Sequence, residues 1–334
     1  MNEVKKIFFP IDKFKEELSS FIEKLQSARN QKFVFLLVGR TGVGKSSTVN
    51  SLIGKLVAPV GHYEPTTMGV ESYPCELNGI EFSVIDTPGL CDDIEEEGND
   101  EKYLELMRSK VSQIDSMWFV SRLDETRVTA DEKRGIKLIT EAFTPQVWEH
   151  AVIVFTYANS VGEARYREAF DKRTELIRKE IAKYVQPDVV NKIPSVAVDN
   201  TIPTTPDGKE WLGELYTKVF QRLSDRGLVP FLLATAESVK PQRVTKTAGT
   251  YRYSSNNSKA SDSSSEDYNQ NTYEAPRINL NEVQKEVVKQ KIIDAGIIPG
   301  LALSGAAIGA TLGPVGAAIG GAVGAAIGLL AWLW

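Results

Sequence analysis

Residues 33–46 read Phe-Val-Phe-Leu-Leu-Val-Gly-Arg-Thr-Gly-Val-Gly-Lys-Ser, an apolar run followed directly by a glycine-rich loop. The six apolar residues at 33–38 predict a buried strand, and the residues after Ser46 are compatible with a helix. The pattern Gly-x-x-x-x-Gly-Lys-Ser between a strand and a helix is typical of a phosphate-binding loop. We therefore expect an α/β fold with a site for a phosphorylated nucleotide at this loop.

The residue types of this loop predict how it holds phosphate. The glycines at 39 and 44 allow tight folding around an anion, so that successive backbone N–H groups face a phosphate. Lys45 is expected to reach the β- and γ-phosphates, and the Ser46 hydroxyl to bind Mg²⁺. The expected substrate is a nucleoside triphosphate, and the expected reaction is phosphoryl transfer to water. The predicted nucleotide contacts in the loop are Gly39, Arg40, Thr41, Gly42, Val43, Gly44, Lys45, Ser46 and Ser47.

The composition of the 334 residues limits the class of partner. Hydrophobic residues make up 42% and charged residues 25%, as in ordinary globular proteins. The net charge of −5 argues against nucleic acid as the main partner, because phosphate backbones attract a basic surface. The two cysteines, Cys75 and Cys91, provide no disulfide framework and suit a reducing compartment. The first residues contain no apolar segment of the secretory type.

Candidate strands and helices alternate between about residues 32 and 224. Helical stretches at 130–143 and 164–184 are long enough to cross between parallel strands. The alternation predicts a mostly parallel central sheet with helices on both faces. Residues 70–77 are expected to add an antiparallel edge strand through a turn at Asn78-Gly79. The other predicted strands are residues 33–38, 82–85, 117–120, 151–155 and 195–198.

A second motif follows the strand at 82–85, where the chain reads Asp86-Thr87-Pro88-Gly89. An aspartate at a strand end after a phosphate loop is the expected holder of Mg²⁺, commonly through water, with Gly89 close to the nucleotide. Between the two motifs, a threonine can bind Mg²⁺ and contact the γ-phosphate only in the triphosphate state. Thr67 is the preferred candidate for this role and Thr66 is the alternative.

Two elements of many small GTPases are absent. The residue after Gly89 is Leu90 in place of a glutamine that orients water, and no Asn-Lys-x-Asp element for guanine occurs. The last predicted strand ends in Asp199, whose carboxylate can accept from the ring N–H and exocyclic amine of guanine. Adenine offers no such donor pair, so this residue favours guanine. The alternative is that Asp199 and Asn200 only cap the strand end.

Several blocks resemble the septin-related GTPases that include the immunity-associated GIMAP proteins and the chloroplast outer-envelope import receptors, the Toc GTPases. The blocks comprise residues 39–47, 85–90, 122–129 and 139–159. The first two occur in many GTPases, whereas the last two are far more specific. The resemblance covers about residues 30 to 225. It implies a P-loop GTPase domain that binds GTP or GDP with Mg²⁺.

The resemblance also implies how the base is held. In the import receptors a Thr-His-Ala segment and a Glu-Asn pair contact guanine, and this chain has Thr156-Tyr157-Ala158 and Asp199-Asn200 at those places. The tyrosine keeps an aromatic face for stacking but changes the hydrogen bonding, and the aspartate keeps the carboxylate. Tyr157, Asp199 and Asn200 are therefore the expected base-binding residues, with guanine as the implied base.

Members of this family dimerise across the nucleotide face. An arginine in the block that matches Arg127 approaches the partner's nucleotide, so the resemblance makes Arg127 a candidate catalytic group in trans, beside Lys45 and Thr67. The alternative is a surface arginine paired with Asp124 or Asp131. The resemblance implies slow, partner-dependent turnover, which agrees with the missing glutamine.

Residues 295–334 contain no charged residue, which predicts a membrane segment. Small residues at every fourth position allow close helix packing in lipid. Two arrangements are open: a single tilted span within residues 315–334, or a helical hairpin bent at Gly313-Pro314. The repetition of the same spacing in both halves favours the hairpin. The glycines concerned are Gly305, Gly309 and Gly313, followed by Gly316, Gly320, Gly324 and Gly328.

Five regions are thus expected: an amphipathic helix (1–30), a GTP-binding domain (31–239), a flexible Ser/Asn-rich linker (240–277), a short amphipathic helix (278–294) and the apolar segment (295–334). The first functional hypothesis is a membrane-anchored, self-associating GTPase whose G domain lies in the cytosol. The second is a glycine-zipper protein that permeabilises or remodels membranes under control of the GTPase domain. The third is a nucleotide-binding interaction module without useful turnover, and ATP hydrolysis is a weaker alternative.

Overall fold

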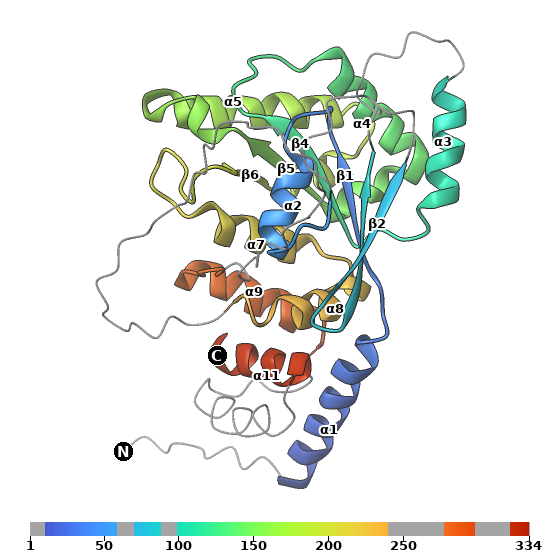
Figure 1. Ribbon diagram of the computed structural model, residues 1–334, viewed down its shortest axis with the longest axis vertical. Helices are drawn as coiled ribbons and strands as arrows, with labels where there is room; N and C mark the ends of the chain where they lie inside the picture. Colours follow the sequence, from blue (N-terminus) through green and yellow to red (C-terminus); the bar gives the residue numbers. More distant parts are fainter. Residues whose placement is uncertain (1–10, 59–69, 88–98, 240–276, 298–320, 334) are drawn as a thin grey trace, which may run out of the picture.

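The computed structural model of the protein describes residues 11–58, 70–87, 99–239, 277–297 and 321–333, with the side chains of all of these except residues 11–18 and 99. A sheet of six strands lies at its centre (Figure 1). The strand order is β2-β3-β1-β4-β5-β6, and every neighbouring pair is parallel except β2 and β3. The strands are β1 (Phe33–Val38), β2 (Glu71–Leu77), β3 (Ile80–Asp86), β4 (Ser116–Arg122), β5 (Ala151–Thr156) and β6 (Ser195–Ala197).

The antiparallel edge strand confirms the hairpin predicted from the sequence. Asn78 and Gly79 connect β2 to β3, with φ angles of 53° and 78°. Two successive residues with positive φ form the turn that matches the right-handed twist of paired strands, and Asn-Gly is the pair that adopts it most readily. The five remaining predicted strands also form, with ends that differ by a few residues.

Helices cover both faces of the sheet, as predicted. Alternate residues of β1 point to opposite faces, so Phe33 and Phe35 enter one apolar core and Val34 and Leu36 enter the other. The first face is covered by α1 (Ile11–Ala28), α2 (Lys45–Ile53), α7 (Trp211–Arg222) and α8 (Asp225–Thr235). The second face is covered by α3 (Asn99–Lys110), α4 (Ala130–Phe143), α5 (Glu163–Ile181), the 3₁₀ helix η1 (Pro145–His150) and the short α6 (Pro187–Val190).

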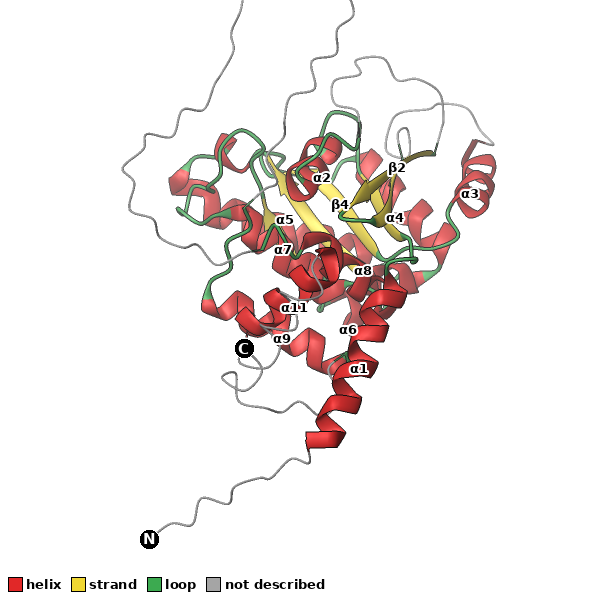
Figure 2. Ribbon diagram, turned by 60° about the horizontal axis from the view of Figure 1, so that its bottom comes forward, coloured by secondary structure: helices red, strands yellow, loops and turns green. Residues whose placement is uncertain are grey.

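Two more helices pack on the helices that cover the first face. Helix α9 (Glu282–Asp294) packs against α7, and α11 (Gly321–Leu333) packs against α8, α9 and α1 (Figures 1 and 2). We call α11 and the three helices that it contacts, α1, α8 and α9, the helical layer. The amphipathic helix expected near the amino terminus is α1, and Phe21 and Leu25 on it are buried in the first core.

The C-terminal helix α11 belongs to this layer. Its Val323, Ile327 and Leu330 are buried in the same core as the sheet residues, and the Lys285 ammonium lies 4.2 Å from the centre of the Trp332 ring. Among the described residues, no helix combines the length and the apolar composition needed to cross a bilayer. The span and hairpin arrangements both involve residues 298–320, and the linker covers 240–276; these stretches lie outside the described residues, so those expectations stay predictions.

Candidate nucleotide site

The phosphate loop connects the end of β1 to the start of α2, at the carboxyl edge of the parallel strands. Gly39 lies so close to β4 that an added Cβ would be 2.2 Å from the carbonyl oxygen of Val120. Gly42 and Gly44 have φ angles of 76° and 94°, which are unfavourable for residues with a side chain. The backbone N–H groups at the start of α2, together with the helix dipole, make this loop suitable for binding an anion.

Lys45 is held inside the loop. Its Nζ donates to the carbonyl oxygens of Gly39 and Arg40 at 2.8 and 3.0 Å, and only 6% of the side chain is exposed. The same Nζ lies 3.5 Å from Oδ1 of Asp86, at the end of β3. The ammonium therefore lies between the loop and the predicted metal-binding aspartate, where it can meet the phosphates of a nucleotide.

Asp86 has the features of a metal-binding carboxylate. Its Oδ1 is buried and has no hydrogen-bond partner, and the lysine contact at 3.5 Å is an ion pair rather than a directed hydrogen bond. Burial raises the pKa of Asp86, against the opposing effects of Lys45 and the Thr87 N–H. A buried carboxylate oxygen without a partner is costly unless a cation or ordered water completes it. The site therefore fits Mg²⁺ held by Asp86 together with Ser46, the second residue of α2.

The end of β5 supports the phosphate loop from the other side. The Thr156 hydroxyl donates to the carbonyl of Val43 at 2.6 Å, and the Tyr157 hydroxyl lies 3.4 Å from the carbonyl of Gly42. Tyr157 has a positive φ of 56°, and the residue is 37% exposed. The Arg122 guanidinium lies 3.9 Å from the centre of that ring. One face of the tyrosine is therefore covered by a cation, at the edge of the loop where the base is expected.

Asp199 and Asn200 occupy the end of β6, near α2. The Asp199 carboxylate accepts from the backbone N–H groups of Asn159 and Thr201 at 3.0 and 3.1 Å and from the Thr201 hydroxyl. Burial alone would raise the pKa of Asp199, but these hydrogen bonds outweigh it and the pKa lies below the usual range. Asn200 donates to the Thr48 hydroxyl at 2.9 Å. The structure thus gives Asp199 the capping contacts of the alternative interpretation, and its base-reading role stays a prediction.

Arg127 lies in the loop between β4 and α4, and its side chain is exposed. The two acids proposed as its partners are engaged elsewhere: Asp124 pairs with Arg122 at 2.7 Å, and Asp131 pairs with Arg40 at 3.2 Å. Within the part of the chain that the structure describes, Arg127 forms no ion pair. Its trans role stays a prediction. Thr66, Thr67 and Gly89 lie outside the described residues.

Comparison with known proteins agrees with this arrangement. Residues 34–190 match the model of the AIG1 family. This part of the chain is similar to the AIG1 family, and we call residues 34–190 the AIG1 domain. The resemblance to GIMAP and Toc proteins inferred from the motifs is thereby confirmed.

Two relatives illustrate the AIG1 relationship. GTP-binding protein A of Dictyostelium discoideum is 35% identical over 162 residues, which cover 48% of this chain and 36% of that protein. Translocase of chloroplast 33 of Arabidopsis thaliana is 32% identical over 170 residues, covering 50% of this chain and 56% of that protein. The chain thus spans about a third to about half of these relatives' own lengths.

The second relative, also called Toc33, has been solved. A dimerisation-deficient mutant of it superposes with a TM-score of 0.50 at 28% identity, covering 61% of this chain and 89% of that one. Toc33 has also been solved with Mg²⁺ and GMPPNP, for which the TM-score is 0.48 at 28% identity, with 64% of this chain and 92% of that chain covered.

Sequence reasoning missed two residues of the AIG1 domain that organise the loop carrying Arg127. Arg173 on α5 is 1% exposed and binds Glu132 on α4, which is also buried. Glu132 could have been found, because Thr129 and Glu132 form a capping box with the Thr-x-x-Glu signature. Arg173 has no local signal, since it is one of several basic residues on a largely charged helix.

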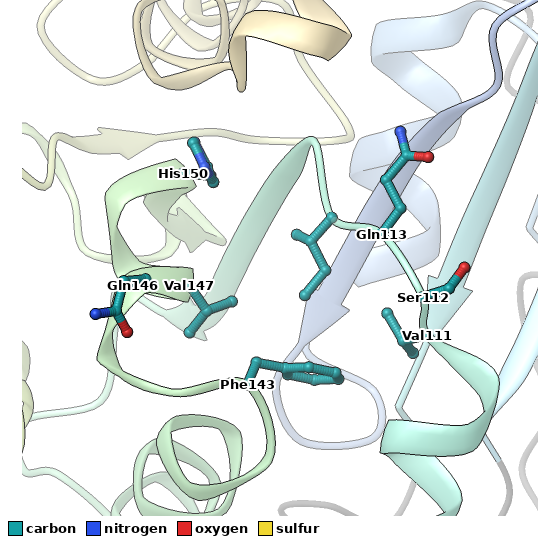
Figure 3. Close-up of a pocket in the computed structure, with 8 residues that line it drawn as sticks. Val111, Ser112, Gln113, Phe143, Gln146, Val147 and His150 are labelled. Atoms are coloured by element: carbon teal, nitrogen blue, oxygen red, sulfur yellow. The ribbon is translucent and has the colours of Figure 1, made fainter.

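One hollow among the described residues lies away from this site. It has a volume of about 220 Å³ and is lined by residues of η1 and of the segment before β4, including Gln113, Val147 and His150 (Figure 3). These residues precede β4 and β5, so the hollow lies at the amino edge of the sheet, opposite the phosphate loop. It is therefore separate from the nucleotide site of the AIG1 domain.

Proposed function

We propose that this chain binds GTP with Mg²⁺ and hydrolyses it slowly to GDP and phosphate. The supporting observation is the phosphate loop whose buried Lys45 lies 3.5 Å from Asp86, a carboxylate with one unpartnered buried oxygen. The backbone of the loop binds the phosphates, and Lys45 neutralises the charge that develops on them during transfer. The guanine base is supported by the relative named GTP-binding protein A.

Mg²⁺ would be held by Ser46, Asp86 and Thr67, and when bound it links the phosphates and offsets their charge. Ser46 lies in the first turn of α2, and Asp86 supplies the unpartnered oxygen. Tyr157 offers an aromatic surface at the edge of the loop, held by its hydroxyl and by Arg122. Asp199 remains ionised at neutral pH and can therefore accept hydrogen bonds from guanine.

We also propose that the domain self-associates across the nucleotide face, with Arg127 reaching the partner's nucleotide. The exposure of Arg127 and the engagement of Asp124 and Asp131 by other arginines support this role. A dimerisation-deficient mutant of the related Toc33 has been solved, which supports dimerisation as a property worth testing here.

The first test is GTP turnover per protomer as a function of protein concentration, with Mg²⁺ present and ATP as the control nucleotide. If a second protomer completes the site, the rate rises with concentration, and Arg127→Ala removes the rise. A flat, very slow rate contradicts dimer-dependent turnover. Equal turnover of ATP and GTP contradicts guanine specificity.

We further propose that the uncharged C-terminal segment contacts a membrane and that the GTPase domain faces the cytosol. The support is the absence of charge from residue 295 to residue 334; because α11 is buried within the protein, the proposed contact falls on the uncharged residues before it. Co-sedimentation of the full chain with liposomes tests the contact, with Ile308→Asp and Ile319→Asp together as the comparison. Loss of sedimentation in the double variant supports insertion. Dye leakage from the same vesicles would instead favour the permeabilising function suggested by the glycine spacing.

A further inference from the structure

The loop that carries Arg127 is held by two arginines from opposite sides. The first is Arg173, which approaches from α5. Its guanidinium donates to the carbonyl of Arg127 at 2.7 Å, to the Ser121 hydroxyl at 2.7 Å and to the carbonyl of Arg122 at 3.4 Å. It also pairs with Glu125 at 3.4 Å and with Glu132. Because Arg173 is almost fully buried, these contacts form with the fold and stay with it.

The second arginine is Arg40, which belongs to the phosphate loop itself. Its Nη1 lies 2.8 Å from Oε1 of Glu125, and its Nε lies 3.2 Å from Oδ2 of Asp131, the second residue of α4. Glu125 therefore lies between Arg173 and Arg40, one oxygen facing each. Glu125 precedes Arg127 in the sequence and Asp131 follows it. The two ion pairs of Arg40 therefore hold the chain on both sides of Arg127.

The two arginines differ in how readily their contacts can change. The Arg40 side chain is 35% exposed, so its pairs exchange with water at low cost compared with those of buried Arg173. The Arg40 carbonyl accepts a hydrogen bond from Nζ of Lys45 at 3.0 Å. A bound phosphate would attract the same ammonium and so compete with this carbonyl for it. A bound phosphate would thus alter the contacts of Arg40, whose side chain holds the loop that carries Arg127.

We propose that Arg40 is a positioning residue that couples the state of the phosphate loop to the placement of Arg127, and thereby makes self-association depend on the bound nucleotide. This inference rests on the proposed GTP binding and self-association through Arg127. Arg40 acts through Glu125 and Asp131, while the phosphates themselves are bound by Lys45 and the loop backbone.

The charges around Glu125 explain why the loop needs Arg40. Burial raises the pKa of Glu125, and the neighbouring Glu132 raises it further, whereas Arg40 and Arg173 oppose both effects. Without Arg40, Glu125 would keep Arg173 as a cationic partner, but the two ion pairs that tie Glu125 and Asp131 to the phosphate loop would be lost. The segment would then be free to move away from the phosphate loop, and Arg127 with it.

The test compares Arg40→Gln and Arg40→Lys in the full chain, kept in mild detergent. Two constants are measured for each: the dimer dissociation constant in a non-hydrolysable GTP analogue with Mg²⁺, by analytical ultracentrifugation, and the GDP affinity. We expect Arg40→Gln to weaken self-association about 10-fold, because two charge-assisted contacts are lost. Arg40→Lys should weaken it about 3-fold, since lysine cannot reach both carboxylates in the same forked geometry. GDP affinity should change by a clearly smaller factor in both variants.

The matched control is Arg167→Gln, which removes an exposed arginine–aspartate pair on α5 and should leave both constants unchanged. Self-association of Arg40→Gln equal to that of the unaltered protein would overturn the inference. Equal losses of GDP affinity and self-association, with a lowered melting temperature, would also overturn it, because they would indicate a merely structural role.

A double-mutant cycle with Arg127→Ala separates the inference from the proposed function. If Arg40 acts through Arg127, Arg40→Gln causes no further loss of self-association once Arg127 is absent. Additive losses contradict the coupling while leaving the proposed dimer intact. If the unaltered protein binds GDP but does not self-associate, the proposed dimerisation fails, independently of any Arg40 variant.

Discussion

In the helical layer the buried contacts are mainly apolar, whereas around the phosphate loop they are ion pairs and hydrogen bonds. Phe21, Ile327 and Leu330 are buried against one another's helices and the first core. Around the phosphate loop, Lys45 instead lies 3.5 Å from Asp86, and Arg40 lies 2.8 Å from Glu125. Apolar burial stabilises a fold without direction, while directed polar contacts can be exchanged for a ligand. The residues that stabilise the fold thus differ from those expected to bind the nucleotide. Substitutions in the helical layer should therefore lower stability, and substitutions in the phosphate loop should lower activity.

The largest expected effect lies in the helical layer. Ile327→Asp places a carboxylate at a fully buried position of α11, which should lower the free energy of unfolding by about 4 kcal/mol. The measurement is urea unfolding followed by tryptophan fluorescence. GDP affinity of the folded fraction should be unchanged, because α11 is distant from the phosphate loop.

The control for this variant is Gly328→Asp on the same helix. Gly328 is exposed, and a Cβ added there meets nothing within 4 Å. It introduces the same charge one residue away and should change the unfolding free energy by less than about 0.5 kcal/mol. Equal stability of the two variants would contradict the packing of α11 against α8, α9 and α1.

The second prediction concerns Arg173, a charged group beside the nucleotide site that behaves as part of the fold. Arg173→Met should destabilise the protein by about 3 kcal/mol, because Glu132 is left as a buried carboxylate without its cation. Adding Glu132→Gln should recover part of this loss, since glutamine is neutral and still completes the capping box with Thr129. Thermal unfolding of both variants provides the comparison, and a double variant less stable than Arg173→Met would argue against the ion pair.

The third prediction is the opposite case, a large loss of activity with a smaller loss of stability. Lys45→Ala should reduce GTP turnover about 100-fold, as expected for the removal of a group that stabilises the transferring phosphate. The melting temperature should fall less than in Arg173→Met, because Lys45 lies 3.5 Å from Asp86 without a short hydrogen bond, and burial already raises the pKa of Asp86 toward its neutral form. A large drop in melting temperature, with GTP turnover lost only in proportion to the unfolded fraction, would show that Lys45 supports the fold instead.

The sequence predicted the features that have local signals, but not the contacts between residues that are distant in the chain. Strand β1 and helix α4 formed over the predicted residues, because a continuous apolar run and a capping box are local signals. Arg173 could not be predicted, since its five acceptors lie in residues 121–132, about 40 to 50 positions away. The pairing of Arg40 with Glu125 and Asp131 was equally invisible, as it depends on β1 and β4 being neighbours in the sheet.

The C-terminal segment shows a different limit of sequence reasoning. A helix that is apolar on all sides can lie in a membrane or in the interior of a protein, and its composition does not distinguish the two. Helix α11 has 13 residues and a length of about 20 Å, short of the roughly 30 Å of a bilayer core. It packs on a surface that α1, α8 and α9 form only after folding. No pattern within residues 321–333 identifies that surface.

The smallest effect is expected for Asp199. This residue lies near the phosphate loop, among the ion pairs and hydrogen bonds, but it makes the contacts of a structural cap. Its folded-state pKa lies below its unfolded-state pKa. The charged carboxylate therefore contributes stability above the unfolded-state value of about 3.9, and this contribution is lost as the pH falls through the folded-state pKa. Asp199→Asn should cost about 1 kcal/mol at pH 7, because an amide oxygen replaces a charged acceptor. The cost should shrink as the pH falls below 4, where the unaltered protein loses the same charge.

Chemical denaturation of both proteins across this pH range measures the difference, and GTP affinity at pH 7 adds a second readout. If Asp199 also accepts hydrogen bonds from guanine, Asp199→Asn should weaken GTP binding by a larger factor than ATP binding. A stability difference that stays constant from pH 7 to pH 3 would contradict the depressed pKa. Equal losses for GTP and ATP would leave Asp199 with its capping role alone, and it would then belong with Arg173 among the charged residues that serve the fold.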